Sequence, residues 1–213
     1  LEAAAEKGVH IVVATGRPFA ALPKDVFDIH AIRYMLTSNG AAITDLEKNE
    51  IFYENCLDPG TVEAAVEMLK DTDYILEGFI GGKAYIEKEY YDHVKKTGRS
   101  FRDVNYILDT RNPIEDLCGF LLEHREHVEN INVNFEDVSC KPALREMLLT
   151  LPNATITTSF KNNMEIGGPT TSKAEALRQL GRLLGVHKDE MLAAGDSPND
   201  MAMLKEAGIA VVM

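Results

Sequence analysis

The sequence predicts an α/β domain, built on a Rossmann-like parallel sheet, that is interrupted by a second domain of α+β character. Helix and strand patterns alternate over residues 1–53 and again over residues 172–213, as in α/β layers. Residues 56–161 instead combine hairpins with helices. We therefore expect a discontinuous, incomplete core of residues 1–55 and 162–213 around an inserted domain of residues 56–161.

The first core segment begins with strong helix formers that stop at Gly8, a residue suited to the position after a helix. Residues 11–14 (IVVA) form a short apolar run, which is typical of a strand covered on both faces. The expected elements, in order, are a helix over 1–7, a strand over 11–14, a helical stretch to about residue 27, a strand over 34–37, and a hairpin of strands over 41–44 and 51–53.

The inserted segment carries a strong hairpin signal at Gly81-Gly82, because glycine adopts the positive φ angles of tight turns. The expected elements around it are helices over 60–70, 89–96 and 141–149, and strands over 74–80, 83–87, 120–124, 132–135, 155–159 and 163–166.

The last segment returns to the α/β pattern, and its first helix starts with the capping box Ser172 and Glu175. The expected elements are a helix over 172–184, a strand over 191–194, a loop over 195–200, a helix over 199–207 and a strand over 209–213.

Composition excludes several classes of protein. The net charge of −12 would repel nucleic acid and anionic lipid, so we expect neither nucleic-acid nor membrane binding. No apolar run reaches the ~20 residues that span a bilayer. Three cysteines without a CxxC motif favour a reducing, cytoplasmic location. Both ends of the sequence fall inside expected elements, which indicates truncation at each end. The sequence does not predict the oligomeric state.

Polar loops follow three of the expected core strands, and ligands of open parallel sheets bind at that edge. Thr15 and Gly16 offer a hydroxyl and a backbone N–H to an anion. Asp196 is a hard carboxylate suited to Mg²⁺, and Lys173 is a point charge suited to phosphate. Each residue also has an ordinary explanation, as a turn former, a helix cap or a surface lysine.

These motifs together resemble the haloacid dehalogenase-like (HAD) phosphatases, specifically the Cof-type subfamily with a type IIB cap. Residues 15–17 (TGR) are similar to its second motif and residues 39–41 (NGA) to the loop that follows. Residues 165–177 are similar to the stretch around its third motif, and residues 195–208, which begin GDSPNDM, to its fourth. The resemblance covers nearly the whole chain and implies the HAD fold, with the inserted domain as the cap.

The resemblance implies a role for each matching residue. Thr15, Gly16, Lys173 and Asn199 would bind the phosphoryl group, with Thr15 and Lys173 acting in catalysis. The metal ligands would come from the acidic loop, with Asp196 binding Mg²⁺ directly.

Asp200 would support that metal site. The family's first motif, Asp-x-Asp, provides the nucleophile and the general acid/base, but no aspartate precedes Thr15 in this sequence. We therefore expect the chain as given to be inactive alone and its parent protein to be a phosphatase.

The function implied is Mg²⁺-dependent hydrolysis of small phosphorylated metabolites, such as sugar phosphates, through an aspartyl-phosphate. Two alternatives stay open: a noncatalytic relative that binds a phosphorylated metabolite, and a phosphotransferase or mutase. The residues that precede Leu1 would separate an enzyme from a binding protein.

Overall fold

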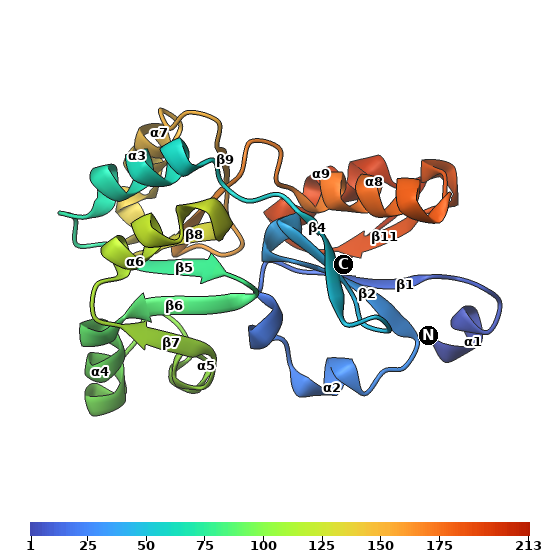
Figure 1. Cartoon of the computed structure of the whole chain (residues 1–213), viewed down its shortest axis with the longest axis horizontal. Helices are drawn as coiled ribbons and strands as arrows, with labels where there is room; N and C mark the ends of the chain where they lie inside the picture. Colours follow the sequence, from blue (N-terminus) through green and yellow to red (C-terminus); the bar gives the residue numbers. More distant parts are fainter. The chain divides into compact units, whose positions relative to one another are not determined.

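The computed structural model describes residues 1–213, and the chain forms two compact units. Unit 1 consists of Leu1–Asn55 and Thr171–Met213, and unit 2 consists of Cys56–Thr170 (Figure 1). The predicted class, an α/β core with an inserted α+β domain, is confirmed. The second boundary lies after Thr170 rather than after residue 161.

The observed boundary differs from the predicted one because β10 (Asn163–Gly167) belongs to the sheet of unit 2. It pairs antiparallel with both β8 (Val128–Asn134) and β9 (Thr155–Thr157). These hydrogen bonds on both sides of β10 hold the segment in the inserted unit.

Unit 1 contains two separate sheets. The first has the order β1-β2-β3-β4, with β1 and β2 parallel and the other pairs antiparallel. The second consists of the parallel strands β11 and β12. The strands are β1 (Ile11–Ala14), β2 (Ile32–Thr37), β3 (Ala42–Asp45), β4 (Glu50–Glu54), β11 (Leu192–Gly195) and β12 (Ile209–Val212).

Helix α8 covers one face of the first sheet with apolar side chains. Its residues Ala176 and Leu180 pack with the buried strand residues Tyr34, Leu36 and Ile43. The helical segments of unit 1 are α1 (Glu2–Ala5), η1 (Phe19–Ala21), α2 (Lys24–Phe27), η2 (Ser38–Gly40), α8 (Lys173–Leu184), η5 (Lys188–Glu190), η6 (Pro198–Asp200) and α9 (Met201–Glu206).

Strand β1 is less enclosed than its apolar sequence predicts. All four residues of Ile11–Ala14 are only half-buried. The strand has a hydrogen-bonded neighbour, β2, on one side only, and β11 is likewise paired only with β12. In each of the two sheets, a strand of a parallel pair therefore lies at the edge with one side free of a hydrogen-bonded neighbour.

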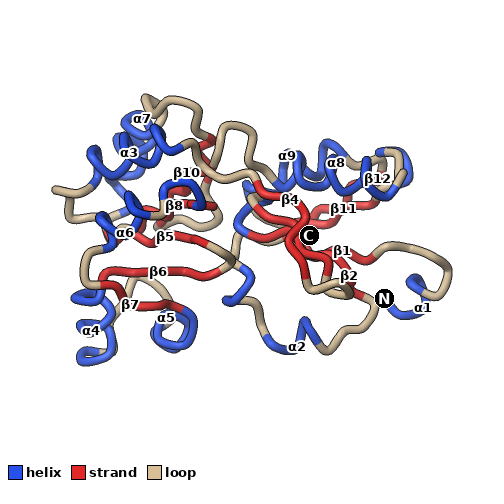
Figure 2. The backbone as a smooth tube through the Cα atoms, in the orientation of Figure 1, coloured by secondary structure: helices blue, strands red, loops and turns tan.

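Unit 2 is built on one six-stranded sheet with the order β7-β6-β5-β8-β10-β9 (Figure 2). Its remaining strands are β5 (Ile75–Ile80), β6 (Lys83–Glu87) and β7 (Arg111–Ile114). Its helical segments are α3 (Pro59–Leu69), α4 (Lys88–Thr97), α5 (Val104–Thr110), α6 (Leu117–Glu123), η3 (Arg125–His127), η4 (Val138–Cys140) and α7 (Lys141–Leu148). One apolar cluster joins the sheet to α3, α6 and α7.

The strand predicted over residues 120–124 is wrong, because residues 120–123 lie in helix α6 and His124 follows it as the C-cap. Asp116 precedes the helix, and its side chain accepts a hydrogen bond from the backbone N–H of Gly119 at 2.8 Å. Leu117 and Leu121, four residues apart, are both buried on the same helix face. The cap and this spacing outweigh the strand propensity of the short apolar run.

The other face of the unit 2 sheet carries a buried polar network. Glu77 forms an ion pair with Arg111 at 2.5 Å, and both side chains are fully buried. Asn132 donates to the second carboxylate oxygen of Glu77 at 2.8 Å and accepts from Asn163 at 3.0 Å. These bonds satisfy charges that would otherwise be costly inside a protein.

No helix of the chain has both the length and the apolar character needed to cross a bilayer.

Candidate active site

The loops that follow β1 and β2 are joined through their backbones. The N–H of Thr15 donates to Leu36 at 2.9 Å, which continues the parallel pairing past the end of β1. The N–H of Asn39 then donates to the carbonyl of Thr15 at 3.0 Å, and that of Ser38 donates to Arg17 at 2.9 Å. These bonds fix the position of the predicted phosphate-binding residues Thr15 and Gly16 against the second loop.

The second loop has an unusual backbone conformation. Ser38, Asn39 and Gly40 have φ angles of 50°, 59° and 93°. Such angles are uncommon for residues with a side chain and are often found at functional sites. Gly40 also lies directly against the backbone carbonyl of Ser172, where a Cβ atom would clash. The loop is thereby packed onto the beginning of α8.

A third loop meets the first two at Gly16. A Cβ atom on Gly16 would lie 2.8 Å from Asn39 Oδ1 and 3.3 Å from Asn199 Nδ2. Asn199 donates to Asn39 Oδ1 at 2.8 Å. An amide NH₂ group has two hydrogens, so this bond leaves one for a ligand. The structure therefore brings Gly16 together with Asn199, which lies 183 positions later in the chain.

Lys173 is the first residue of α8, and it is buried rather than being a solvated surface lysine. Ser172 caps the helix by accepting a hydrogen bond from the N–H of Glu175 at 3.1 Å. The Lys173 Nζ atom lies 2.5 Å from Asp200 Oδ1, and the two side chains are only 6% and 8% exposed. A buried ion pair thus connects the start of α8 to the acidic loop.

Asp200 also organises its own loop. Its second oxygen, Oδ2, accepts hydrogen bonds from the backbone N–H groups of Asp196 at 3.2 Å and Ser197 at 3.1 Å. Burial alone would raise the pKa of Asp200. The hydrogen bond and the charge of Lys173, together with these N–H donors, outweigh burial and lower that pKa below its ordinary value. Asp200 is therefore ionised at neutral pH.

Asp196 lies in the same loop but has a different environment. Its side chain is exposed, and Oδ1 accepts a hydrogen bond from the Ser197 hydroxyl at 3.0 Å. Its other oxygen has no protein partner, whereas both oxygens of Asp200 are engaged. Mg²⁺ is commonly held by one or two carboxylates with water and substrate phosphate, so Asp196 fits as a direct ligand and Asp200 fits as its support. No group of three or more His, Cys, Asp or Glu side chains suited to a metal occurs in residues 1–213.

Three of the six predicted site residues, Thr15, Gly16 and Asn199, meet at Asn39, to which the sequence assigned no individual role. The structure gives it three links: a backbone bond to Thr15, contact with Gly16 and a side-chain bond to Asn199. The only sequence signal for it was the Asn-Gly pair after a strand, which also marks ordinary turns. Thr15 itself accepts a hydrogen bond from the N–H of Arg17 at 3.1 Å, so its hydroxyl can still donate.

Several known proteins are similar to this chain in sequence over almost its whole length. Phosphatase YwpJ of Bacillus subtilis is 25% identical over 240 residues, which cover 100% of this chain and 80% of that protein. The 5-amino-6-(5-phospho-D-ribitylamino)uracil phosphatase YcsE of the same organism is 26% identical over 212 residues, covering 99% of this chain and 72% of that protein.

Solved structures share the fold. A haloacid dehalogenase-like hydrolase from B. subtilis superimposes with a TM-score of 0.81 at 24% identity, covering 100% of this chain and 80% of that chain. A sugar phosphatase of HAD subclass IIB gives a TM-score of 0.77 at 21% identity, covering 100% and 76%. The profile of the haloacid dehalogenase-like hydrolases matches residues 1–213 in full. The chain therefore belongs to the haloacid dehalogenase-like hydrolase family.

Proposed function

We propose that the protein is a phosphatase that hydrolyses small phosphorylated metabolites, of the sugar phosphate type, with Mg²⁺ and through an aspartyl-phosphate intermediate. The observation that carries this proposal is the convergence of three loops of unit 1 around Gly16, with the buried Lys173–Asp200 pair beside the acidic loop. The names of the relatives support the reaction class, since several are phosphatases.

The residues present would act by binding and stabilising the phosphoryl group. Thr15 would donate its hydroxyl and Gly16 its backbone N–H to the phosphoryl oxygens, and Asn199 would add its second amide hydrogen. Lys173 would neutralise charge on the equatorial oxygens, where phosphoryl transfer needs stabilisation. These groups are held in place before substrate arrives, so little reorganisation is needed during the reaction.

Asp196 would hold Mg²⁺, which when bound supplies positive charge to the phosphate. Asp200 would act indirectly, because its hydrogen bonds to the N–H groups of Asp196 and Ser197 fix the loop that presents the metal ligand. The same carboxylate positions Lys173.

We infer that the nucleophilic aspartate lies on a strand that precedes Leu1. The unpaired edges of β1 and β11 support this inference, since each can accept a further strand. An Asp-x-Asp at the carboxyl end of such a strand would come next to the loops that begin at Thr15 and Asp196. Unit 2 would act as the cap, and the protein would be cytoplasmic, which the three free cysteines support.

The test uses the protein extended at its N-terminus to include the preceding residues, with p-nitrophenyl phosphate as substrate. Turnover is expected with Mg²⁺ and not with EDTA, and Lys173→Met should abolish it. Lys205→Met is the matched control, because Lys205 is an exposed lysine of α9 with no ion pair. Equal activity of the two variants would contradict the role of Lys173.

The two alternatives give different results in the same assay. A noncatalytic binding protein would bind phosphate without turnover and would lack Asp-x-Asp before Leu1. A phosphotransferase would form a phosphorylated product with an added alcohol acceptor. Robust turnover by the 213-residue chain alone would refute the proposal that the nucleophile lies upstream.

A further inference from the structure

The side chain of Asn199 has a single hydrogen-bond partner in the protein. Its Nδ2 atom donates to Asn39 Oδ1 at 2.8 Å, whereas its own Oδ1 atom is buried and has no partner. An amide carries donors at one end and an acceptor at the other, on two ends of nearly the same shape. The bond to Asn39 alone therefore sets which way the Asn199 amide is turned.

This orientation matters because the amide lies beside the predicted phosphate site. The position that a Cβ atom on Gly16 would take lies 3.3 Å from Asn199 Nδ2 and 2.8 Å from Asn39 Oδ1. The nitrogen end of Asn199 is thus the end next to Gly16. A phosphate dianion presents acceptor oxygens, so the nitrogen end can donate to it, whereas a reversed amide would present its oxygen and repel it.

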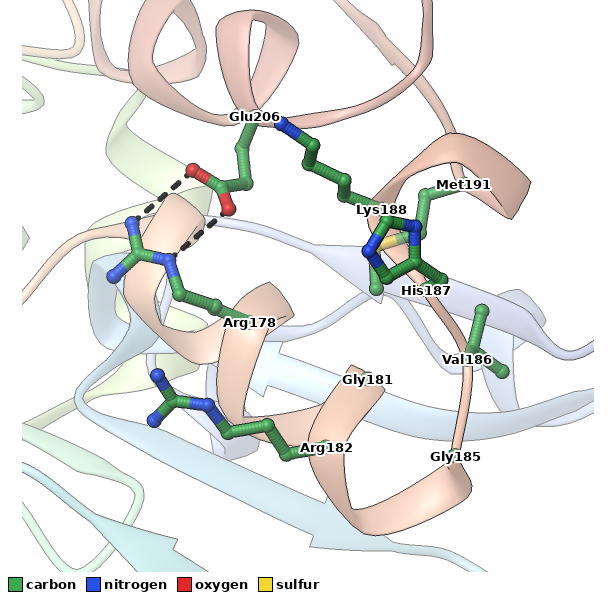
Figure 3. Close-up of a pocket in the computed structure, with 9 residues that line it drawn as sticks. All are labelled: Arg178, Gly181, Arg182, Gly185, Val186, His187, Lys188, Met191 and Glu206. Carbon is green, nitrogen blue, oxygen red and sulfur yellow. Dashed lines mark hydrogen bonds and ion pairs between the residues drawn. The ribbon is translucent and has the colours of Figure 1, made fainter.

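The backbone that carries Asn199 is held to α8 at two points, and neither involves the amide. The next residue, Asp200, pairs with Lys173 at the start of α8. At the end of α9, Glu206 accepts hydrogen bonds from Arg178 of α8 at 3.1 Å and 3.2 Å, and Figure 3 shows this pair between the two helices. These ties fix where residue 199 lies but leave the rotation of its amide to Asn39.

Asn39 is well placed to set that rotation because it is itself held firmly. Its N–H donates to the carbonyl of Thr15 at 3.0 Å, and the N–H of the preceding residue, Ser38, donates to Arg17 at 2.9 Å. Only 4% of Asn39 is exposed. Its side-chain oxygen is therefore a fixed acceptor that is in position before any ligand arrives.

The left-handed backbone at Asn39 explains only part of these contacts. Asparagine adopts positive φ more readily than most residues, and Asn49 and Asn153 do so in exposed turns, with φ of 54° and 48°. The backbone conformation is a sufficient reason for asparagine at those two positions. Asn39 has a similar φ of 59°, but its side chain is buried and bonded to the other segment of unit 1. A turn does not require that bond.

We propose that Asn39 is a positioning residue, whose side-chain oxygen turns the Asn199 amide so that an Nδ2 hydrogen can donate to the phosphoryl group bound at Thr15 and Gly16. This inference rests on the proposed function, which supplies the phosphoryl group. Asn39 acts through Asn199 rather than on the substrate. Without it the Asn199 amide could rotate, and it would have to be ordered each time a substrate bound, at a cost in affinity.

The first test follows the Asn199 amide by NMR in the ¹⁵N-labelled 213-residue chain. Asn39→Gly removes the side chain but keeps the backbone conformation, because glycine adopts positive φ without strain. The Nδ2 resonances of Asn199 should shift toward those of an exposed asparagine. Asn49→Gly is the matched control, since it makes the same change in an exposed turn, and it should leave these resonances unchanged. Unchanged Asn199 resonances in Asn39→Gly would overturn the inference, whatever the activity.

The second test measures kinetics in the N-terminally extended protein with p-nitrophenyl phosphate and Mg²⁺. Asn39→Gly should raise KM about tenfold, the effect of losing one hydrogen bond to a charged group, and should change kcat much less. Asn199→Ala should have a similar effect. The double variant should be no weaker than either single variant, because both substitutions remove the same oriented donor. Asn49→Gly should match the wild type.

The outcomes separate this inference from the proposed function. Additive losses in the double variant would show that Asn39 acts apart from Asn199, and would overturn the inference while leaving the phosphatase proposal intact. A lower kcat with an unchanged KM would overturn it as well, because binding of the phosphoryl group would then not depend on Asn39. An extended wild-type protein without turnover would refute the phosphatase proposal, whereas the role of Asn39 in orienting Asn199 would still be decided by the NMR test.

Discussion

Replacing Lys173 by methionine should destabilise unit 1 strongly. The substitution keeps an unbranched side chain but removes the ammonium that lies 2.5 Å from Asp200 Oδ1. The Asp200 carboxylate would remain in a site where its side chain is only 8% exposed. Removing one partner of a buried ion pair leaves an uncompensated charge, at a cost of about 3–5 kcal/mol.

Two hydrogen bonds reduce but do not cancel this cost. The N–H groups of Asp196 and Ser197 still donate to Asp200 Oδ2 in the variant. We therefore expect a loss near 3 kcal/mol, at the lower end of that range. The double variant Lys173→Met/Asp200→Asn removes both charges and should regain more than half of the loss, because an uncharged pair needs no compensation.

The pH dependence of unfolding gives an independent measurement. In the wild type the pKa of Asp200 is lowered below its ordinary value, so its contribution to stability is complete well above the ordinary pKa of an aspartate and is lost as the pH falls through the folded-state pKa. In Lys173→Met, burial raises the pKa of Asp200. The variant should therefore gain stability relative to the wild type as the pH is lowered toward 4, since the folded state then binds the proton more tightly than the unfolded state.

Urea unfolding, followed by circular dichroism between pH 4 and pH 7, would measure both effects. A loss below about 1 kcal/mol, which is typical of an exposed pair, would refute the reasoning. A variant whose stability followed the wild-type pH profile would refute it as well, because the carboxylate would then be solvated.

Three further substitutions test other parts of the structure. Gly40→Ala combines a φ of 93° with a clash against α8 and should cost about 2 kcal/mol in urea unfolding, whereas an unchanged midpoint would contradict the described packing. Gly16→Ala would place a methyl group 2.8 Å from Asn39 Oδ1 and should weaken binding of inorganic phosphate about tenfold, measured by calorimetry; unchanged affinity would separate Gly16 from the site. Arg111→Leu leaves Glu77 buried and unpaired, and it should lower the free energy of unfolding of unit 2 by about 3–5 kcal/mol. Adding Glu77→Leu to this variant should restore part of the loss, and a double variant no more stable than Arg111→Leu would contradict the role of the ion pair.

Much of the fold could be predicted from local sequence signals. Glycine at Gly81-Gly82 marked the hairpin of β5 and β6, and Ser172 with Glu175 marked the start of α8. Prediction failed where tertiary or capping contacts decide the structure. Residues 120–123 form part of α6, and Asp116 caps that helix.

The loops of the candidate site could be predicted, but their contacts could not. Thr15, Lys173 and Asp196 follow strands or begin helices at places that sequence motifs identify. The burial of Lys173 against Asp200 depends on folding of the chain between residues 173 and 200, and no local pattern shows it. The contact of Asn39 with Asn199 joins the two segments of unit 1, so only the assembled unit reveals it.

The division of unit 1 into two chain segments has a consequence for how the protein folds during synthesis. Unit 2 is one continuous segment, and every residue of it has left the ribosome before Thr171 emerges. The first segment, Leu1–Asn55, must therefore wait for α8 to cover β2 and β3, with apolar groups such as Leu36 and Ile43 unprotected in the meantime. Contacts of such long sequence separation form slowly and leave exposed surface open to aggregation. Nascent chains that are arrested after Thr170, before the second segment of unit 1 is made, should therefore bind chaperones through residues 1–55.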